Sequence, residues 1–317
     1  MKIAEKIISV VKSEKKILIS THINPDGDAL GSALSLAAAL NSIGKKTFVY
    51  CRDRVPETYR FLPGYRNVIS KIQEALKGDP LLILLDCNSP ERAALEKFQF
   101  RYSIVIDHHE TEKDFGDIRW VDPKAAATGM MVFSLIKDIG VKITKDIAIN
   151  LYTAIAADTG TFRYSNTSPE VLKAGAELVK AGAEPDFIAS QLYETWDKKR
   201  FDLLISALNT LVIKEGIAIM HISREMFRRT GTKYEDTEHF SNFPRMVGSV
   251  KVSAVFKETG NGVWKASLRS KGDINVAKIA EQYEGGGHRN AAGFRIKTDL
   301  ATARRMLIQA VKKLGNK

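Results

Sequence analysis

Three short apolar runs stand out in the early part of the chain: KILIS at 16–20, PLLILLD at 80–86 and YSIVID at 102–107. Each is rich in branched residues and is bounded by polar or turn-forming residues, which is typical of a strand buried on both faces of a parallel sheet. The segment 28–44 has the spacing of a helix instead, with Asp28 placed to cap its start and Gly44 to end it. Strands alternating with helices predict an α/β fold with an open, mostly parallel sheet.

The pattern changes in the second half of the chain. Helices are predicted at about 127–139, 144–157, 168–182 and 184–213. After Gly216, the segments IAIMHIS, GSVKVSAVFKE and VWKASLRS resemble strands, and a helix over about 275–284, a glycine run and a closing helix over about 299–314 follow.

A chain of 317 residues exceeds the usual size of a single core. We therefore expect a catalytic domain over 1–190, a helical connector over 191–213 and a smaller α/β domain over 214–317. The functional site is expected in the cleft between the two domains.

The composition is that of a globular protein, with 44% hydrophobic and 27% charged residues. Charges interrupt the N-terminal stretch MKIAEKIISVVKSEKK, which predicts an amphipathic helix and not a signal peptide. No apolar run is long enough to span a membrane, and Cys51 and Cys87 form no metal or redox motif. These features favour a cytoplasmic protein that does not bind membranes. The sequence leaves open whether the protein forms a homodimer.

The net charge of +11 is unevenly distributed. Residues 1–198 carry 26 basic and 26 acidic side chains, whereas residues 199–317 carry 22 and 11. This asymmetry predicts that the second part attracts a polyanion or a phosphorylated ligand. A solvated basic surface that aids solubility explains the charge equally well.

Acidic and imidazole side chains follow each of the three apolar runs. THINPDGD follows the first run, Asp86 closes the second, and Asp107-His108-His109 close the third. Asp158, after the apolar helix LYTAIAA, adds a fourth contribution. Because the carboxyl ends of parallel strands line the crevice where ligands bind, we expect these groups to meet in one place.

Converging carboxylates need cations, because two of them about 4 Å apart repel by about 4 kcal/mol at an effective dielectric constant of 20. Oxygen and imidazole ligands without thiolates favour Mn²⁺ or Mg²⁺, with Co²⁺ or Zn²⁺ as substitutes. Each motif alone has a simpler explanation: Asn24 to Gly27 as a tight turn, Asp28 as a helix cap, and His108-His109 as a surface loop. Only their coincidence predicts a metal site.

These motifs resemble those of the DHH phosphoesterases, and among them the NrnA-like group. The corresponding segments are HINPDGDALGS at 22–32, LLDCNSPERA at 84–93, DHH at 107–109 and ADTGTFRYSNTSPE at 157–170. The C-terminal part is similar to the associated DHHA1 domain, with SLRS at 267–270 and EGGGHRNAAGF at 284–294. The resemblance covers essentially the whole chain.

The resemblance implies two divalent metal ions, in the first place Mn²⁺. Asp86 would bridge the two ions. The implied ligands are His22, Asp26 and Asp86 for one ion, and Asp28, Asp86, His108 and Asp158 for the other.

The resemblance also implies roles for the remaining residues of the third motif. Asp107 would orient ligands and His109 would donate a hydrogen bond to the phosphate. Asp86, Asp107, His108 and His109 would form the catalytic group. No separate Ser, Cys or His nucleophile is assigned.

Substrate contacts are expected from both parts of the chain. Glycine backbone N–H groups can approach an anion closely, and basic side chains can add charge-assisted hydrogen bonds. The candidates are His109, Arg163, Arg269, Gly285, Gly286, Gly287 and His288. A flexible loop is the alternative for the glycine run, and a surface ion pair for Arg163. Four rings lie among basic residues, where a base could stack although core packing is commoner: Phe227, Tyr234, Phe240 and Phe243.

The leading functional hypothesis, implied by the resemblance, is hydrolysis of very short oligoribonucleotides to mononucleotides and of 3′-phosphoadenosine 5′-phosphate (pAp) to AMP. Cleavage of linear or cyclic dinucleotides such as pApA and c-di-AMP uses the same metal site and is the alternative. A non-catalytic nucleic-acid-binding protein is the alternative from another class. The acidic cluster argues against it, because carboxylates without cations repel phosphates.

Overall fold

The computed structural model describes residues 2–109 and 113–315, and contacts divide the chain into two compact units, residues 1–195 and 196–317. We call them the N-terminal and C-terminal units. Within the described ranges, no helix is both long and apolar enough to cross a membrane.

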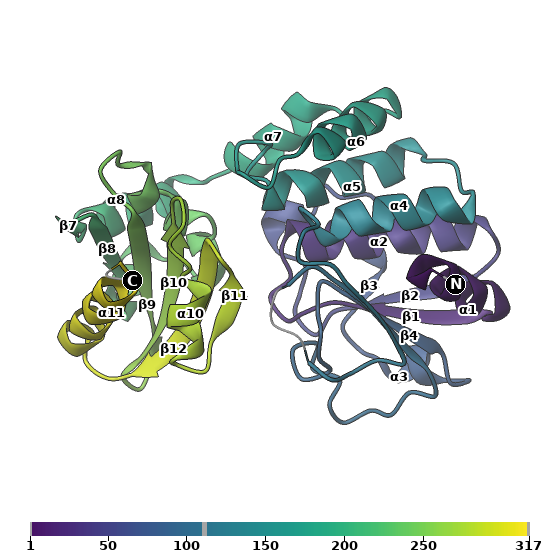
Figure 1. Ribbon diagram of the computed structural model, residues 1–317, viewed down its shortest axis with the longest axis horizontal. Helices are drawn as coiled ribbons and strands as arrows, with labels where there is room; N and C mark the ends of the chain where they lie inside the picture. Colours follow the sequence, from purple (N-terminus) through teal and green to yellow (C-terminus); the bar gives the residue numbers. More distant parts are fainter. Residues whose placement is uncertain (1, 110–112, 316–317) are drawn as a thin grey trace. The chain divides into compact units, whose positions relative to one another are not determined.

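The N-terminal unit contains a six-stranded sheet in which every neighbouring pair is parallel. The strand order is β3-β2-β1-β4-β5-β6 (Figure 1). The strands are β1 (Lys16–Ser20), β2 (Lys46–Tyr50), β3 (Val68–Ile69), β4 (Leu81–Leu85), β5 (Ser103–Asp107) and β6 (Ile118–Val121). The parallel sheet predicted from the apolar runs is therefore confirmed.

Both faces of this sheet are buried. Successive side chains of a strand point to opposite faces, so one strand contributes to two cores. Ile17 and Ile19 belong to the large core beneath the main helices, whereas Leu18 belongs to a smaller core on the other face. Helices α2, α4, α5 and α6 lie on one side of the sheet and α3 lies on the other (Figure 1). The helices are α1 (Ile3–Ser13), α2 (Gly27–Ser42), α3 (Gln73–Leu76), α4 (Thr128–Ile139), α5 (Lys145–Asp158), α6 (Pro169–Lys180) and α7 (Pro185–Tyr193).

Helices α2 and α5 approach each other closely and run antiparallel. A Cβ atom on Gly31 would lie 2.3 Å from the backbone oxygen of Asn150, and one on Gly27 would lie 2.8 Å from Cβ of Ala157. Only glycine permits this separation. The start of α2, with its two aspartates, therefore lies beside the end of α5, where Asp158 is the last helical residue.

Helix α2 begins differently from the prediction. Asp26, and not Asp28, is the capping residue, because its Oδ1 accepts a hydrogen bond from the Ala29 backbone N–H at 3.1 Å. The predicted cap at Asp28 is wrong, since that carboxylate accepts hydrogen bonds from another helix. Gly44, with a φ of +80°, ends the helix as predicted.

The helix predicted over 184–213 is interrupted. Helix α7 ends at Tyr193, and α8 (Lys198–Leu208) starts anew with Asp197 as its cap, whose carboxylate accepts from the Arg200 backbone N–H at 2.8 Å. Leu203 and Leu204 of α8 are buried in a core of the C-terminal unit. The apolar spacing of two adjacent amphipathic helices resembles that of one long helix, so the break between them has no strong signal in the sequence.

The C-terminal unit is built on a mixed six-stranded sheet with the order β11-β12-β10-β9-β8-β7. Its strands are β7 (Val212–Lys214), β8 (Ile217–Ile222), β9 (Val252–Gly260), β10 (Val263–Ser270), β11 (Gly286–His288) and β12 (Ala291–Lys297). Helices α10 (Ala277–Glu281) and α11 (Leu300–Gly315) cover one face. Residues 234–246, three short 3₁₀ turns that follow helix α9 (Arg224–Thr230), contact β9 and β10 with Phe240 in the core.

The glycine run is a strand and not a flexible loop. Gly286 to His288 pair antiparallel with β12 in a hairpin. A Cβ atom on Gly285 would lie 2.2 Å from the backbone oxygen of Gly293, and Gly287 has a φ of +139°. The glycines are needed at least in part because two backbones meet there.

Candidate metal centre

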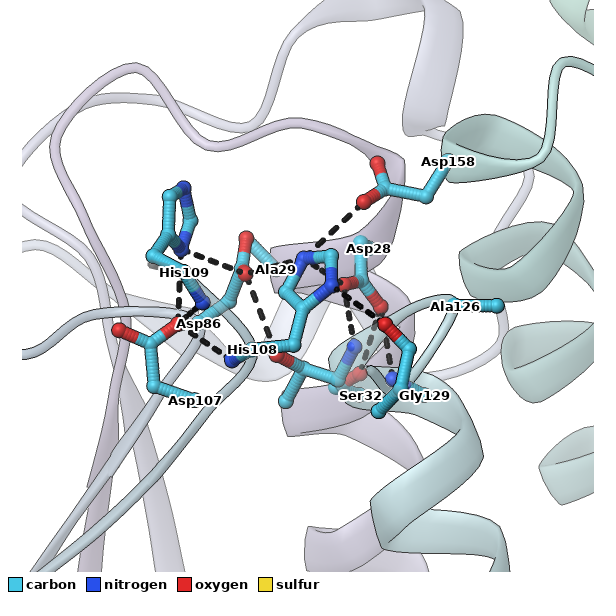
Figure 2. Close-up of polar contacts among 12 residues, drawn as sticks. Asp28, Ala29, Ser32, Asp86, Asp107, His108, His109, Ala126, Gly129 and Asp158 are labelled. Atoms are coloured by element: carbon cyan, nitrogen blue, oxygen red, sulfur yellow. Dashed lines mark hydrogen bonds and ion pairs between the residues drawn. The ribbon is translucent and has the colours of Figure 1, made fainter. Parts of the chain in front are cut away.

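The structure brings all the predicted metal and catalytic residues of the N-terminal unit together at the carboxyl ends of the strands. They come from the segment after β1, the start of α2, the ends of β4 and β5, and the end of α5. Figure 2 shows six of them: Asp28, Asp86, Asp107, His108, His109 and Asp158. The group consists of His22, Asp26, Asp28, Asp86, Asp107, His108, His109 and Asp158. Segments far apart in sequence therefore form one site.

The first cluster surrounds the Nε2 atom of His22. Asp86 Oδ2 lies 3.4 Å from this nitrogen and Asp26 Oδ1 lies 3.9 Å from it. The His22 side chain is 13% exposed and Asp86 is 3% exposed, whereas Asp26 is 46% exposed. The cluster is thus open on the Asp26 side.

The second cluster surrounds the Nε2 atom of His108. Carboxylate oxygens of Asp158, Asp86 and Asp28 lie 3.1, 3.4 and 3.6 Å from it. His108 and Asp28 are buried, and Figure 2 shows the three carboxylates arranged around the ring.

Asp86 belongs to both clusters and turns a different oxygen to each. Its Oδ2 faces His22 and its Oδ1 faces His108. The Thr128 hydroxyl donates to Oδ1 at 3.1 Å, which fixes the carboxylate plane. Asp86 follows β4 directly and has a φ of +54°, an uncommon conformation for a residue other than glycine. This local turn of the backbone accompanies a carboxylate placed between the two histidines.

The two imidazoles are oriented through their other ring nitrogen. Nδ1 of His22 lies 2.9 Å from the backbone oxygen of Ile23, and Nδ1 of His108 lies 3.2 Å from that of Ala125. A carbonyl oxygen only accepts, so Nδ1 must carry the hydrogen in both rings. Each Nε2 is then directed at the carboxylates, as in metal sites where the second nitrogen sets the tautomer.

Asp28 caps a helix other than its own. Its Oδ2 accepts from the Thr128 backbone N–H at 2.7 Å, and its Oδ1 accepts from the Gly129 N–H at 2.8 Å and from the Ser32 hydroxyl at 3.1 Å. Thr128 and Gly129 form the first turn of α4, whose N-terminal N–H groups favour an anion. Asp28 is therefore held rigidly, with His108 on its remaining side (Figure 2).

Burial and mutual repulsion shift the ionisation of these groups. Burial and the charges of Asp86 and Asp158 raise the pKa of Asp28 well above its usual value. Burial lowers the pKa of His22, but the hydrogen bond to Asp86 and the neighbouring carboxylates outweigh it and raise the pKa to about 9. For His108 the same competition, with Asp158 and Asp86, raises the pKa well above 6.5. Without metal, protons on the histidines supply the positive charge that this site requires.

The donor set fits two divalent ions. Ligand atoms of His22, Asp26 and Asp86 lie within 4.8 Å of one another, and so do those of Asp28, His108 and Asp158. Two ligands about 2.1 Å from one ion and at right angles lie about 3 Å apart, close to the spacing between the Nε2 atoms and the carboxylate oxygens. The oxygen-rich donors are those that Mn²⁺ and Mg²⁺ prefer.

Asp107 and His109 form a pair beside the clusters. Asp107 Oδ1 accepts from His109 Nδ1 at 2.7 Å, from the His108 N–H at 2.8 Å and from the His109 N–H at 3.2 Å. Burial would raise the pKa of Asp107, but the His109 hydrogen bond outweighs it and lowers the pKa. Asp107 is fully buried, so it holds the DHH turn in shape while His109, at 14% exposure, reaches the edge of the site.

An unusual turn follows Asp158. Gly160, Thr161 and Phe162 have consecutive φ values of +57°, +59° and +60°. Left-handed backbone costs about 1–2 kcal/mol for a residue other than glycine, so surrounding contacts must stabilise it. Thr161 Oγ1 bonds the Tyr193 hydroxyl at 2.8 Å, and the exposed Arg163 donates from Nε to the Gly160 oxygen at 2.7 Å. This hydrogen bond orients the Arg163 side chain.

The predicted substrate contacts of the C-terminal unit lie on adjacent elements of one sheet. Arg269 is near the end of β10, opposite Ala291 of β12. Ala291 in turn pairs with His288 of β11, the strand that also contains Gly286 and Gly287. Arg269 and His288 are therefore two strand positions apart across the sheet.

The sequence interpretation missed the residues that hold the ligands. Thr128, Gly129, Ser32 and the Ala125 carbonyl contact the predicted ligands, but none of them was predicted to do so. The one local signal is the helix start at Thr128-Gly129, because helix N-termini attract carboxylates.

Comparisons with known proteins found similarity over nearly the whole chain. Residues 16–155 match the DHH family, N-terminal domain, and residues 227–314 match the DHHA1 domain. The bifunctional oligoribonuclease and PAP phosphatase NrnA of Thermus thermophilus is 35% identical over 98% of this chain and 93% of its own length, and that of Bacillus subtilis is 26% identical over 92% of each. The crystal structure of an exopolyphosphatase-related protein from Bacteroides fragilis superposes with a TM-score of 0.88 at 28% identity, covering 98% of this chain and 96% of the other.

Proposed function

Since the chain belongs to the NrnA-like group of the DHH/DHHA1 family, we propose that it is a phosphohydrolase that degrades very short oligoribonucleotides to mononucleotides and dephosphorylates pAp to AMP. The observation that carries the proposal is Asp86, which presents one carboxylate oxygen to each of two histidine clusters. A carboxylate shared in this way suits a pair of metal ions acting on a phosphate ester.

DHH phosphoesterases depend on metal, and we propose Mn²⁺ as the ion of this protein. His22, Asp26 and Asp86 would hold one ion, and Asp28, Asp86, His108 and Asp158 would hold the other. When bound, the ions would lower the pKa of water and neutralise charge on the phosphate.

The protein's own side chains and backbone would hold the metal ligands and the substrate phosphate in position. The Nδ1–H bonds of His22 and His108 keep each Nε2 directed inward, and the first turn of α4 keeps Asp28 in place. His109, held by Asp107, would donate to a phosphate oxygen of the substrate, and Arg163 would add a charge-assisted hydrogen bond. No side chain is needed as a nucleophile.

The C-terminal unit would bind the substrate. Residues 196–317, which form this unit, carry all the excess positive charge of the chain. Arg269, His288 and the backbone of Gly285, Gly286 and Gly287 would contact a terminal phosphate. Salt-dependent binding is the expected signature of such contacts.

The test is hydrolysis by the purified protein with Mn²⁺, using ribonucleotides of two to five residues, pAp, pApA and c-di-AMP. We expect mononucleotides from the oligomers, AMP and phosphate from pAp, and no turnover after chelation. Asp86→Ala should abolish hydrolysis and leave salt-sensitive binding of an oligomer intact, because binding depends largely on the basic unit. Preference for c-di-AMP or pApA would favour the dinucleotide alternative, and inertness toward every substrate would refute the proposal.

A further inference from the structure

Three basic side chains lie directly opposite one another on adjacent strands of the C-terminal unit. Lys257 of β9 is paired with Lys265 of β10, and Lys265 is paired with Arg295 of β12. We call them the basic row. Like charges directly opposite in a sheet are destabilising, so a row of three needs an explanation.

No carboxylate neutralises the basic row through an ion pair within the described ranges. Burial, followed by the charge of Lys265, lowers the pKa of Lys257 to about 7, although Glu238 and Glu235 act in the opposite direction. Burial and the charge of Arg295 lower the pKa of Lys265. Burial and like charge thus destabilise the protonated lysines of the row, and an anion bound beside them would stabilise the protonated forms.

Tyr234 extends over the basic row. Its ring centroid lies 4.1 Å from Nζ of Lys257 and 5.9 Å from Nζ of Lys265. Its hydroxyl is shielded from solvent, and the described part of the chain offers it no hydrogen-bond partner. Burial raises the pKa of Tyr234 to about 12 while Arg295 acts to lower it, so the hydroxyl remains a donor near that guanidinium.

A small cavity of about 120 Å³ opens beside Lys257. Thr237, Glu238, His239 and Ser267 contribute to its wall. The Thr237 hydroxyl accepts from Nζ of Lys257 at 2.7 Å. Sites for whole small molecules measure about 300–1,000 Å³, so this one suits a single anionic group. Lys257 is the member of the basic row that lines the cavity, and Lys265 and Arg295 follow on the neighbouring strands, so the cationic side chains outnumber Glu238 and favour a phosphate.

We propose that the basic row is a second phosphate-binding site, which takes a phosphodiester of an oligoribonucleotide other than the phosphate at Arg269. Arg269 and Lys265 are four residues apart on β10 and side chains at this spacing share a face, so their backbone positions are about 13 Å apart. A ligand with several phosphates can use both places. The inference rests on the proposed function and adds to it a reason why the protein accepts chains longer than one nucleotide.

The test compares Lys265→Gln, Arg295→Gln and their combination with Lys278→Gln, an exposed position on α10 that carries the same change in charge. The double variant should raise the ratio of KM for a pentaribonucleotide to KM for pAp at least tenfold, and Lys278→Gln should leave it unchanged. Tyr234→Phe, which removes only the hydroxyl, should raise it by a few fold. A ratio within twofold of wild type in the double variant would overturn the proposal.

Binding measured without metal separates this proposal from the proposed function. Fluorescence anisotropy of a labelled pentaribonucleotide in EDTA should show weaker binding by the double variant, and the slope of log K against log salt should become shallower by about 0.7 for each phosphate that the variant no longer neutralises. If wild type proves inactive but these shifts appear, the hydrolytic function fails and the binding site stands. If hydrolysis is normal and the double variant binds like wild type, the binding site fails. Because the substitutions remove like-charge repulsion, the Tm should not fall, which excludes misfolding as the cause.

Discussion

Asp86→Asn tests whether one carboxylate holds two metal ions. Oδ1 of Asp86 accepts a hydrogen bond from the Thr128 hydroxyl, and Oδ2 faces Nε2 of His22 at 3.4 Å. Asparagine keeps one oxygen, which Thr128 will retain, so the amide NH₂ must face His22. The substitution therefore removes the shared ligand from the His22 cluster in particular.

The size of the effect follows from the lost charge. A carboxylate and a single positive charge about 4 Å apart attract by about 4 kcal/mol at an effective dielectric constant of 20, and a dication is attracted more strongly. This corresponds to about a thousandfold in affinity for the ion at His22 and Asp26. The His108 cluster keeps Asp28 and Asp158, so its ion should bind more weakly but remain.

The assay is Mn²⁺ content after dialysis, with calorimetric titration for each site. Wild type should bind two ions per chain and Asp86→Asn one, and hydrolysis should be nearly abolished because the proposed chemistry needs both ions. Thr128→Val is the matched control: it removes the hydroxyl that orients Asp86 but leaves the carboxylate, and we expect two ions with affinity or activity reduced about 10–100-fold. Two ions bound to Asp86→Asn with wild-type affinity would refute the bridging argument.

Three further predictions concern stability and ionisation. Gly31→Ala should lower the free energy of unfolding by about 1–3 kcal/mol, because its Cβ would lie 2.3 Å from the Asn150 oxygen. Gly248→Ala, which meets only open space and needs no positive φ, should cost less, and equal Tm values would contradict this. In the metal-free protein, protonated His22 contributes to the free energy of unfolding; this contribution is fully present below pH 6.5 and is lost as the pH rises through about 9. The change is about 3 kcal/mol, and His22→Gln should remove it from the pH profile of unfolding. Asp107→Ala should lower the free energy of unfolding by about 1–3 kcal/mol, since it leaves the buried N–H donors of His108 and His109 without their acceptor. Asp107→Asn keeps an acceptor and should restore most of the Tm; no difference between the two variants would exclude the positioning role.

The parts of the fold that could be predicted are those whose signal is local. Strands β1, β4 and β5 are buried on both faces and are therefore continuous apolar runs in the sequence. Strand β2, KTFVY, begins with an exposed lysine and lacks such a run, and the two residues of β3 are too short to give a pattern. These strands are defined by their neighbours in the sheet, which the sequence alone does not reveal.

The candidate site shows the same division. Histidines and aspartates at strand ends could be located because strand ends converge, but the role of Asp28 depends on Thr128, one hundred residues away. The expectation that Asp28 caps its own helix was wrong, because the first turn of α4 offers two N–H groups to its carboxylate. The basic row likewise becomes visible only when the strand register places Lys257, Lys265 and Arg295 side by side.

The division of Asp86 between two clusters has a consequence for how the protein matures during synthesis. His22, Asp26 and Asp86 are all present once β4 and the residue after it have been made, whereas the His108 cluster must wait for Asp158 at the end of α5. Domains begin to fold from the N-terminus as the chain emerges, and a bound ion stabilises only the structure that holds it. In a nascent chain that has completed β4 but not β5, the edge of β4 that will pair with β5 is exposed. The ligands of the first ion are already present at this stage. Early metal capture would therefore tie β1 to β4 before β5 and β6 have been made.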